Sequence, residues 1–554
     1  MPLKLCSRFT ILKINLLYLC CRMQKIESFI SKFPGKTFAF LLLLAVPAFF
    51  SNLGLLPLFA DEPTRANVAL EMILTGNYSV PTIGGEYYYN KPPLYNWILA
   101  LIYQVSGSFS EFVTRLPALI PLFLFAVTIY FSVIYFLRNK FVALLSAMFS
   151  MVNGRMLIYD SMLGHIDIFY SWLTFISFMC IFYFYQKKQW FLLFFSSYVL
   201  TAVTFLAKGI PSIIFQGLTI ITLLIYTKNF KRLFSWQHIL NGLFCILLIS
   251  AYFYNYSLYN SDLRGYFSTI WDQSSQRTAA SVGIWKSIKH VFLFPIEYLG
   301  HLFPASLLVV FCFHKGFITQ VFKNDFLKFC SLTFIVNVLV YWLSPETRPR
   351  YLLMLFPLLF IIWSYAYYSF RDSLPKINKV FEAILIGLSL LVTLVIPTAF
   401  LFDLNTYVDF FAAKVALVFL LVGLFTVLVI RFKNHKVVAF LGFLLVVRLG
   451  FSWFVLPYRF ERGEGRYFKT ASTEMAEISG REPFYFYQYH PHVASIPFHD
   501  KLIFYIQLAR MKQVKFTETD TVKGYYLTFD RDLNNPTAVL LKSYDSNLKL
   551  YKVK

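Results

Sequence analysis

Carboxylates and cations stand at the ends of long apolar stretches in this sequence. Ionisable groups at membrane depth are costly, so such placement indicates a functional site. Asp61 and Glu62 follow one apolar stretch, and Asp167 directly precedes another. Several cations on one face can bind a phosphodiester and stabilise the negative charge that grows on a departing phosphate. The residues that could supply this charge, together with one hydroxyl, are Lys91, Lys208, Arg277, Arg348 and Tyr351.

A carboxylate beside such cations can take a proton from an acceptor hydroxyl or stabilise an oxocarbenium-like sugar. The combination predicts the transfer of a sugar that leaves a phosphate. The sequence contains neither a Walker loop nor a Gly-x-Gly-x-x-Gly motif after a strand-like stretch. A lipid-linked donor is therefore favoured over a nucleotide-linked one, and a lipid tether explains a site at the membrane edge.

Each of these residues also has a structural explanation. Asp61, Glu62 and Asp167 could cap helices, since acidic side chains favour the positive N-terminal end. Lys91 could extend to the lipid interface, and His165 is expected to be structural. A transporter would also hold charges in its bundle, but near the midplane and with internal repeats. Here the charges stand at span ends on one side and no repeat is evident, which favours a catalytic site.

The elements that must position these residues are apolar. Of the 554 residues, 58% are hydrophobic and 14% charged, whereas a soluble domain carries roughly 25% charged residues. A helix of about 20 apolar residues crosses a bilayer with its backbone satisfied. We therefore expect an all-α polytopic membrane protein with about 13 transmembrane helices. The expected spans are 38–59, 115–137, 141–158, 168–186, 190–206, 210–227, 238–257, 291–313, 327–344, 351–370, 380–402, 409–430 and 437–456.

The composition divides the chain into three parts. Residues 1–37 are expected to be an N-terminal cytoplasmic tail, in which either Met1 or Met23 could be the start. Residues 38–457 form the expected transmembrane domain. From 458 to 554 the chain is polar, with mixed charge and short β-like runs. This last part predicts a small soluble α/β domain.

The charges of the connecting loops predict the orientation. Alternate connections are rich in Lys and Arg and contain two acidic residues, Asp325 and Asp372. The positive-inside rule places these connections and the N-terminus in the cytoplasm, and an odd number of spans places the C-terminal domain outside. Two long loops, 60–114 and 258–290, then lie on the outer side. Long structured loops are usually functional, and the polar residues singled out above fall on this side.

Neither the net charge nor the cysteines point to another class of protein. The charge of +23 comes from Lys and Arg in small groups between apolar blocks, as topology signals are arranged, so no nucleic-acid partner is expected. The seven cysteines show neither metal-ligand spacing nor a disulfide framework. No metal site or cofactor is assigned, although a divalent ion that bridges Asp61 or Asp167 to a phosphate remains open.

The order and spacing of several short segments resemble those of a known family. Over most of residues 55–370 the chain is similar to the bacterial aminoarabinose lipid A transferases and to related dolichyl-phosphate-mannose protein mannosyltransferase-like enzymes of the GT-C class. The segments are Asp-Glu-Pro-Thr-Arg (61–65), Tyr-Asn-Lys-Pro-Pro-Leu-Tyr-Asn-Trp (89–97), Phe-Val-Thr-Arg-Leu-Pro-Ala (112–118), Gly-His-Ile-Asp (164–167), Ala-Lys-Gly-Ile-Pro (207–211), Trp-Asp-Gln-Ser-Ser-Gln-Arg (271–277) and Arg-Pro-Arg-Tyr-Leu-Leu (348–353).

The resemblance implies a GT-C fold, a polyprenyl (undecaprenyl) phosphate sugar donor and inversion at the anomeric carbon. It makes Asp61 a general base or acceptor-orienting group and places Lys91 near the donor phosphate. Lys208 and Arg277 would hold that phosphate, and Tyr351 would donate a hydrogen bond to it. The positions that the resemblance assigns to the lining of the donor cavity are Asp167, Lys208, Arg277 and Tyr351.

The sugar and the acceptor stay open because the chain departs from the pattern. The lysine-rich stretch that precedes the tyrosine in aminoarabinose transferases is replaced here by Pro-Glu-Thr-Arg at 345–348. We expect transfer to lipid A or another envelope acceptor on the periplasmic side of a bacterial inner membrane. The alternatives are a protein O-glycosyltransferase with the same kind of donor and a transporter of lipid-linked sugars without chemistry.

Overall fold

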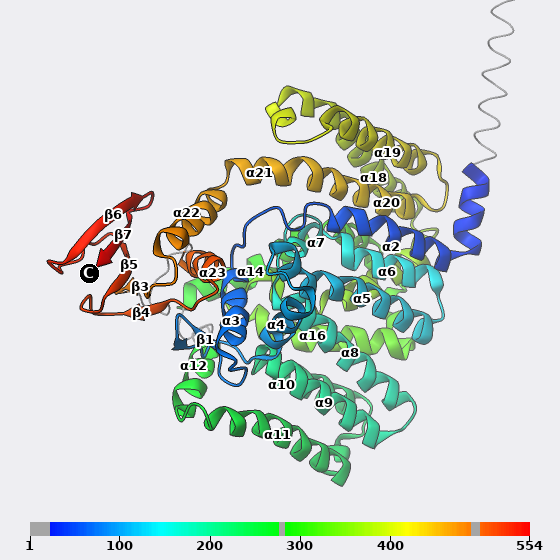
Figure 1. Ribbon diagram of the computed structural model, residues 1–554. Coiled ribbons are helices and arrows are strands. Elements are labelled where there is room, and N and C mark those ends of the chain that lie inside the picture. The colour runs from blue at the N-terminus through cyan, green and yellow to red at the C-terminus, as the bar shows by residue number, and fades with distance from the viewer. Residues whose placement is uncertain (1–22, 276–282, 489–498) are drawn as a thin grey trace, which may run out of the picture.

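The computed structural model describes residues 23–275, 283–488 and 499–554. A bundle of helices makes up most of the molecule, and a small sheet domain projects from one end of it (Figure 1). The membrane part contains the helices α2 (Pro34–Phe50), α5 (Glu111–Leu137), α6 (Lys140–Val152), α7 (Gly154–Ile158), α8 (Ile166–Gln186), α9 (Trp190–Lys208), α10 (Pro211–Tyr226), α11 (Trp236–Ser257), α14 (Ile284–His301), η3 (Ala305–Phe313), α15 (Phe317–Lys323), α16 (Asp325–Trp342), α17 (Phe356–Phe370), α18 (Pro375–Val395), α19 (Phe411–Arg431), α20 (Lys436–Gly450) and α21 (Leu456–Arg462).

The apolar helices confirm a polytopic membrane protein but not the number of spans. Among the described residues, eight helices are long and apolar enough to cross a membrane, or up to eleven if three bent pairs each count as one span. Two further apolar helices, α10 and α17, are shorter. Each of the thirteen expected ranges overlaps one of these elements. The count of thirteen is not confirmed, because it is reached only if every bent pair and both short helices are counted as spans.

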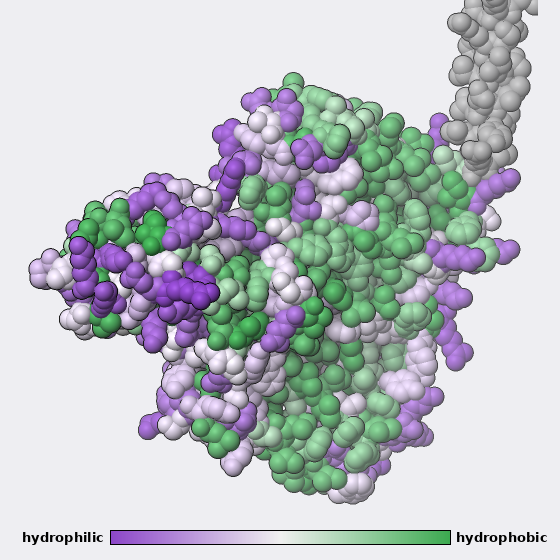
Figure 2. Space-filling view, in the orientation of Figure 1, coloured by the Kyte–Doolittle hydropathy of each residue, from purple (hydrophilic) through white to green (hydrophobic). Residues whose placement is uncertain are grey.

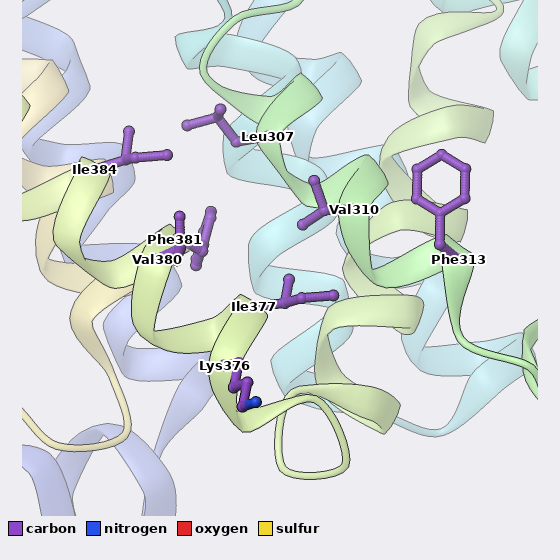
Figure 3. Close-up of a pocket in the computed structure, with 8 residues that line it drawn as sticks. All are labelled: Leu307, Val310, Phe313, Lys376, Ile377, Val380, Phe381 and Ile384. Carbon is purple, nitrogen blue, oxygen red and sulfur yellow. The ribbon is translucent and has the colours of Figure 1, made fainter.

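The surface of the bundle fits a membrane environment. Apolar residues cover its side in a broad band, while hydrophilic residues gather at the end of the bundle opposite the sheet domain and over the sheet domain itself (Figure 2). A lipid-facing surface needs such a band because hydrocarbon cannot solvate polar groups. A pocket of about 420 Å³ lies between η3 and α18 (Figure 3). Apart from Lys376 its lining is apolar, and it contains none of the expected site residues.

A sharp turn places Lys208 at the end of a helix. Gly209 adopts φ +85° directly after α9, a conformation that favours glycine. Pro211 then begins α10, as proline often does at a first helical position. The turn therefore ends α9 at Lys208 and directs the chain into the next helix.

The first outer loop is a compact structure of its own. It contains α3 (Glu62–Thr75), a hairpin of β1 (Thr82–Ile83) and β2 (Glu86–Tyr87), and α4 (Leu94–Ser106). The buried carboxylate of Glu71 accepts hydrogen bonds from the hydroxyl of Thr82 at 2.7 Å and the backbone N–H of Gly84 at 2.5 Å. Glu71 therefore fixes the hairpin against α3.

The C-terminal part confirms the expected small α/β domain. Its sheet has the order β4-β3-β5-β7-β6, with β3 parallel to β4 and β5 and the other pairs antiparallel. Val68 and Met72 of α3 belong to the same buried cluster as the core of this domain, so the domain and the first outer loop share one core. Its elements are α22 (Glu464–Ser479), β3 (Phe484–Tyr487), α23 (His499–Arg510), β4 (Lys515–Thr517), β5 (Gly524–Phe529), β6 (Ala538–Tyr544) and β7 (Leu548–Val553).

Replacing Gly84 with Ala is expected to loosen the contact between the hairpin and the C-terminal domain. A Cβ at Gly84, whose φ is +62°, would overlap the ring of Phe516. Gly76→Ala is the matched control, because Gly76 has φ +70° and nothing lies within 4 Å of its added Cβ. Both changes carry backbone strain of about 1–2 kcal/mol. Hydrogen exchange of β4 should be faster in Gly84→Ala than in Gly76→Ala, and equal exchange would contradict the contact.

Candidate active site

Four charged side chains from distant parts of the sequence form a chain of ion pairs. Lys208 Nζ lies 2.5 Å from Asp167 Oδ1, and Arg350 Nε lies 3.5 Å from Asp167 Oδ2. Arg350 Nη2 in turn donates a hydrogen bond to Asp61 Oδ2. The ion-pair chain (Asp61, Arg350, Asp167 and Lys208) therefore brings together three residues that the sequence singled out for catalysis or donor binding.

Helix ends position the members of the ion-pair chain. Asp61 immediately precedes α3, and Asp167 lies in the first turn of α8, where a helix N-terminus favours negative charge. Lys208 is the last residue of α9, where a cation is favoured. Arg350 lies in the short 3-10 helix η4 (Pro349–Leu352). The two carboxylates therefore lie at helix N-termini and the lysine at a helix C-terminus, so the helix dipoles stabilise all three charges.

Arg350 contacts both carboxylates of the ion-pair chain and also His165. Its Nη1 lies 3.2 Å from Nδ1 of His165, which is 3% exposed. Burial lowers the pKa of His165, and the nearby guanidinium of Arg350 lowers it further, which favours the neutral imidazole as an acceptor. Burial by itself lowers the pKa of Arg350, but the carboxylates of Asp167 and Asp61 outweigh it and raise that pKa. Arg348 is exposed, and its charge helps to lower the pKa of Asp61.

Asp61 is a charged and accessible carboxylate. Its side chain is 50% exposed. Partial burial raises the pKa of Asp61, but Arg350 and other nearby cations more than compensate, so its pKa lies below the ordinary value. Asp61 is therefore ionised at neutral pH and can accept a hydrogen bond or a proton from an incoming group.

Glu62, the residue next to Asp61, lies in a different environment from Asp61. Its carboxylate is fully buried and binds Arg115 through Nε at 2.9 Å and Nη2 at 3.0 Å. The backbone N–H groups of Gly164 and Phe59 also donate to it, at 2.6 and 3.0 Å. With its oxygens occupied by these donors, the geometry favours a structural role for Glu62 over the catalytic one that the sequence suggested.

A small polar pocket lies beside the ion-pair chain. We call it the lysine pocket; its volume is about 50 Å³. Lys208 Nζ lies 4.7 Å from the centroids of the Tyr351 and Tyr170 rings, which hold the ammonium group by cation–π contacts. Arg277, which the resemblance assigns to the phosphate, lies outside the described residues. The lysine pocket is lined by Asn90, Lys91, Pro92, Lys208, Gly209, Ile210, Pro211, Ile270, Tyr341 and Tyr351.

The chain is similar in sequence to a family model and to two curated proteins. Residues 90–254 match the family model described as dolichyl-phosphate-mannose-protein mannosyltransferase. Two curated relatives are the undecaprenyl phosphate-alpha-4-amino-4-deoxy-L-arabinose arabinosyl transferases 1 and 2 of Proteus mirabilis. The first is 26% identical over 46% of this chain and 47% of its own length, the second 25% identical over 53% and 52%. The chain thus spans about half the length of these relatives.

Solved structures extend the likeness to nearly the whole chain. The crystal structure of ArnT from Cupriavidus metallidurans bound to undecaprenyl phosphate matches with a TM-score of 0.65 and 14% identity, over 93% of this chain and 98% of that one. Its apo state matches with a TM-score of 0.63, 16% identity and coverage of 93% and 97%. The chain therefore has the fold of a polytopic GT-C membrane glycosyltransferase. Within that class its likeness is to the ArnT type, which confirms the resemblance seen in the sequence.

The different environments of Asp61 and Glu62 predict different effects on stability. Glu62→Gln leaves the buried Arg115 without its carboxylate, and breaking a buried ion pair costs about 3–5 kcal/mol. Asp61→Asn should cost less, because Asp61 is half-exposed and Arg350 keeps Asp167. Thermal unfolding of the purified protein in detergent measures both. Equal losses in the two variants would count against a purely structural Glu62.

Proposed function

We propose that the protein is an inverting glycosyltransferase that moves a sugar from undecaprenyl phosphate to an envelope acceptor, with lipid A first among the candidates. The observation that carries the proposal is the position of Lys208. It lines the lysine pocket and is joined to Asp61 through Asp167 and Arg350. A phosphate-binding cation and an accessible carboxylate are thus held in one assembly, as transfer from a phosphodiester requires.

In this proposal the donor phosphate binds in the lysine pocket between Lys91 and Lys208, and the hydroxyl of Tyr351 donates to it. Arg348 adds positive charge beside Asp61, and the resemblance assigns Arg277 to the same phosphate. Asp167 does not react; it holds Lys208 at 2.5 Å and so fixes the ammonium group before the donor arrives. Such preorganisation is the largest contribution of most active sites to lowering a barrier.

Asp61 acts on the acceptor. Its carboxylate orients the attacking oxygen and, when that oxygen belongs to a hydroxyl, accepts its proton. The oxygen forms a bond to the anomeric carbon while the bond from that carbon to the phosphate oxygen breaks, and the electron pair leaves on the phosphate. The products are an inverted glycoside and undecaprenyl phosphate; with a hydroxyl acceptor, the proton is first on Asp61.

We infer that the chain lies in a bacterial inner membrane with this site facing the periplasm. The distribution of Lys and Arg over alternate loops supports that orientation. In this arrangement residues 1–37 are a cytoplasmic tail, residues 38–457 the transmembrane catalytic domain and residues 458–554 a periplasmic domain. The loops 60–114 and 258–290 then meet the donor from the outer side.

One observation favours a different acceptor. The family model that matches residues 90–254 is described as a protein mannosyltransferase, which is compatible with a hydroxyl of a secreted protein as the attacking group. A non-catalytic transporter is the further alternative. It predicts movement of the lipid without cleavage of the sugar–phosphate bond.

The reaction class is tested by label transfer. Protein in lipid nanodiscs receives undecaprenyl phosphate carrying a radiolabelled sugar, from a panel of sugars, together with lipid A or envelope extract. Labelled acceptor and free undecaprenyl phosphate are expected, and Asp61→Asn should abolish both while the protein still inserts. Asp403→Asn, an exposed acidic residue in another loop, is the control. Normal transfer by Asp61→Asn would remove Asp61 from the mechanism, and intact donor with every acceptor would favour the transporter.

The assignment of the phosphate site is tested by binding. Lys91→Met and Lys208→Met each remove one charge from the lysine pocket, and a hydrogen bond to a charged group is worth about 1.5–3 kcal/mol. The affinity for undecaprenyl phosphate should therefore fall by roughly 10- to 100-fold. Lys323→Met, at an exposed lysine of α15, is the control. Unchanged affinity in both pocket variants would place the phosphate elsewhere.

A further inference from the structure

A second pocket adjoins the lysine pocket. Its volume is about 100 Å³, and Asn90 lines both pockets, so the two share a wall. We call it the acidic pocket. Its walls come from α3, from the β1–β2 hairpin and from α23 of the C-terminal domain. The lining residues that bear on its chemistry are Thr64, Glu86, Tyr87, Tyr88, Asn90 and Asp500.

Interactions between the two domains build this pocket. The hydroxyl of Thr64 donates to the carboxylate of Asp500, and Asn67 Nδ2 donates to the backbone carbonyl of Asp500 at 2.7 Å. Gln507 Nε2 lies 3.3 Å from Asn67 Oδ1. These contacts fix the start of α23 against α3, so Asp500 is held at the pocket by its side chain and its backbone.

The hairpin wall is fixed in the same way. Gln513 of the C-terminal domain donates through Nε2 to Glu71 Oε2 at 2.7 Å, the same oxygen that accepts from Thr82. The backbone N–H of Phe516 donates to the carbonyl of Gly84 at 3.3 Å. The pocket is therefore a formed site between the first outer loop and the C-terminal domain.

The chemistry of the acidic pocket differs from that of the lysine pocket. Its lining contains two carboxylates, Glu86 and Asp500, the amide of Asn90 and the ring of Tyr87, but no Lys or Arg. Carboxylate and amide oxygens accept hydrogen bonds from hydroxyls, and an aromatic ring packs against the apolar face of a sugar. A phosphate would meet like charge there. Arg65 packs on the ring of Tyr88 at 5.5 Å and is not among the lining residues.

Asp61 is not a lining residue of the acidic pocket but lies on the same side of α3 as Thr64, which is. Thr64, which lines the pocket, follows Asp61 by one helical turn, and residues at this spacing share a helix face. Tyr88 lines the acidic pocket. Burial chiefly raises its pKa, the nearby Arg65 lowers it, and the charges of both Asp61 and Asp500 raise it, so both carboxylates act on this side chain. A hydroxyl held in the acidic pocket is thus close to the carboxylate that is proposed to accept its proton.

We infer that the acidic pocket binds the acceptor by its hydroxyl groups, and that the attacking group is an uncharged sugar hydroxyl and not a phosphate. This inference rests on the proposed function. The acceptor O–H gives its proton to Asp61 while its oxygen replaces the phosphate oxygen at the anomeric carbon, and the electron pair of the broken bond leaves on the phosphate. The C-terminal domain contributes Asp500 and so takes part in choosing the acceptor.

The test uses the full chain in nanodiscs and two acylated glucosamine disaccharides as probes, one phosphate-free and one carrying phosphates at both ends. The phosphate-free probe is expected to bind and to be glycosylated. Glu86→Gln and Asp500→Asn should each weaken its binding at least tenfold, while the affinity for undecaprenyl phosphate changes less than twofold. Glu477→Gln, an exposed residue of α22, is the control. The side chain of Glu86 is exposed and makes no contact described above with the C-terminal domain, so its variant remains informative if Asp500→Asn loosens the domain contact.

The outcomes separate this inference from the proposed function. Donor cleavage that requires the phosphorylated probe, or that neither pocket variant alters, would overturn the inference and leave the glycosyltransferase standing. Binding of the phosphate-free probe that depends on Glu86, without cleavage of any donor, would overturn the proposed reaction and leave the pocket as a sugar site. Failure of the wild-type protein to bind the phosphate-free probe would overturn the pocket assignment.

Discussion

The buried ion pair between Arg115 and Glu62 is the interaction on which the site depends. Each buried charge costs several kcal/mol unless it is paired and hydrogen-bonded. Here Arg115 also donates to the carbonyl of Leu53 at 2.6 Å, and Glu62 also accepts from the N–H of Gly164. Segments near residues 53, 62, 115 and 164 are thereby fixed to one another. Asp61 is the neighbour of Glu62, and His165 the neighbour of Gly164, so the pair sets the distance across which Arg350 binds both.

The same electrostatic constraint operates in the ion-pair chain. Asp61 and Asp167 carry two negative charges, and Arg350 and Lys208 carry two positive ones, so the assembly is balanced before a donor binds. Lys91 brings a further positive charge to the lysine pocket, and a phosphodiester brings one negative charge. In the proposed reaction the two lysines of the pocket attract this negative charge, and a site of low dielectric strengthens that attraction.

The sequence predicts the membrane fold well because long apolar stretches leave a helix as the only way to satisfy the backbone. It does not predict the number of spans, because α10 and α17 are short and three other stretches bend sharply. Nor can it tell the buried Glu62 from the exposed Asp61, since the two are adjacent and equally acidic. Their difference depends on Arg115, which lies 53 positions away in the sequence. The sequence assigned Arg348 to the donor phosphate and gave Arg350 no role of its own. Only the three-dimensional fold shows that Arg350 binds Asp61.

The C-terminal domain illustrates the same limit. Its polar composition predicts a separate soluble unit, yet Val68 and Met72 of α3 complete its core. The apolar face of α3 carries no sign of its partner, because a hydrophobic stripe specifies burial but not the surface that buries it. The shared core has a functional consequence. Since α3 begins directly after Asp61 and also supports the hairpin that precedes Lys91, a displacement of the domain would move the proposed base and the proposed phosphate-binding loop together.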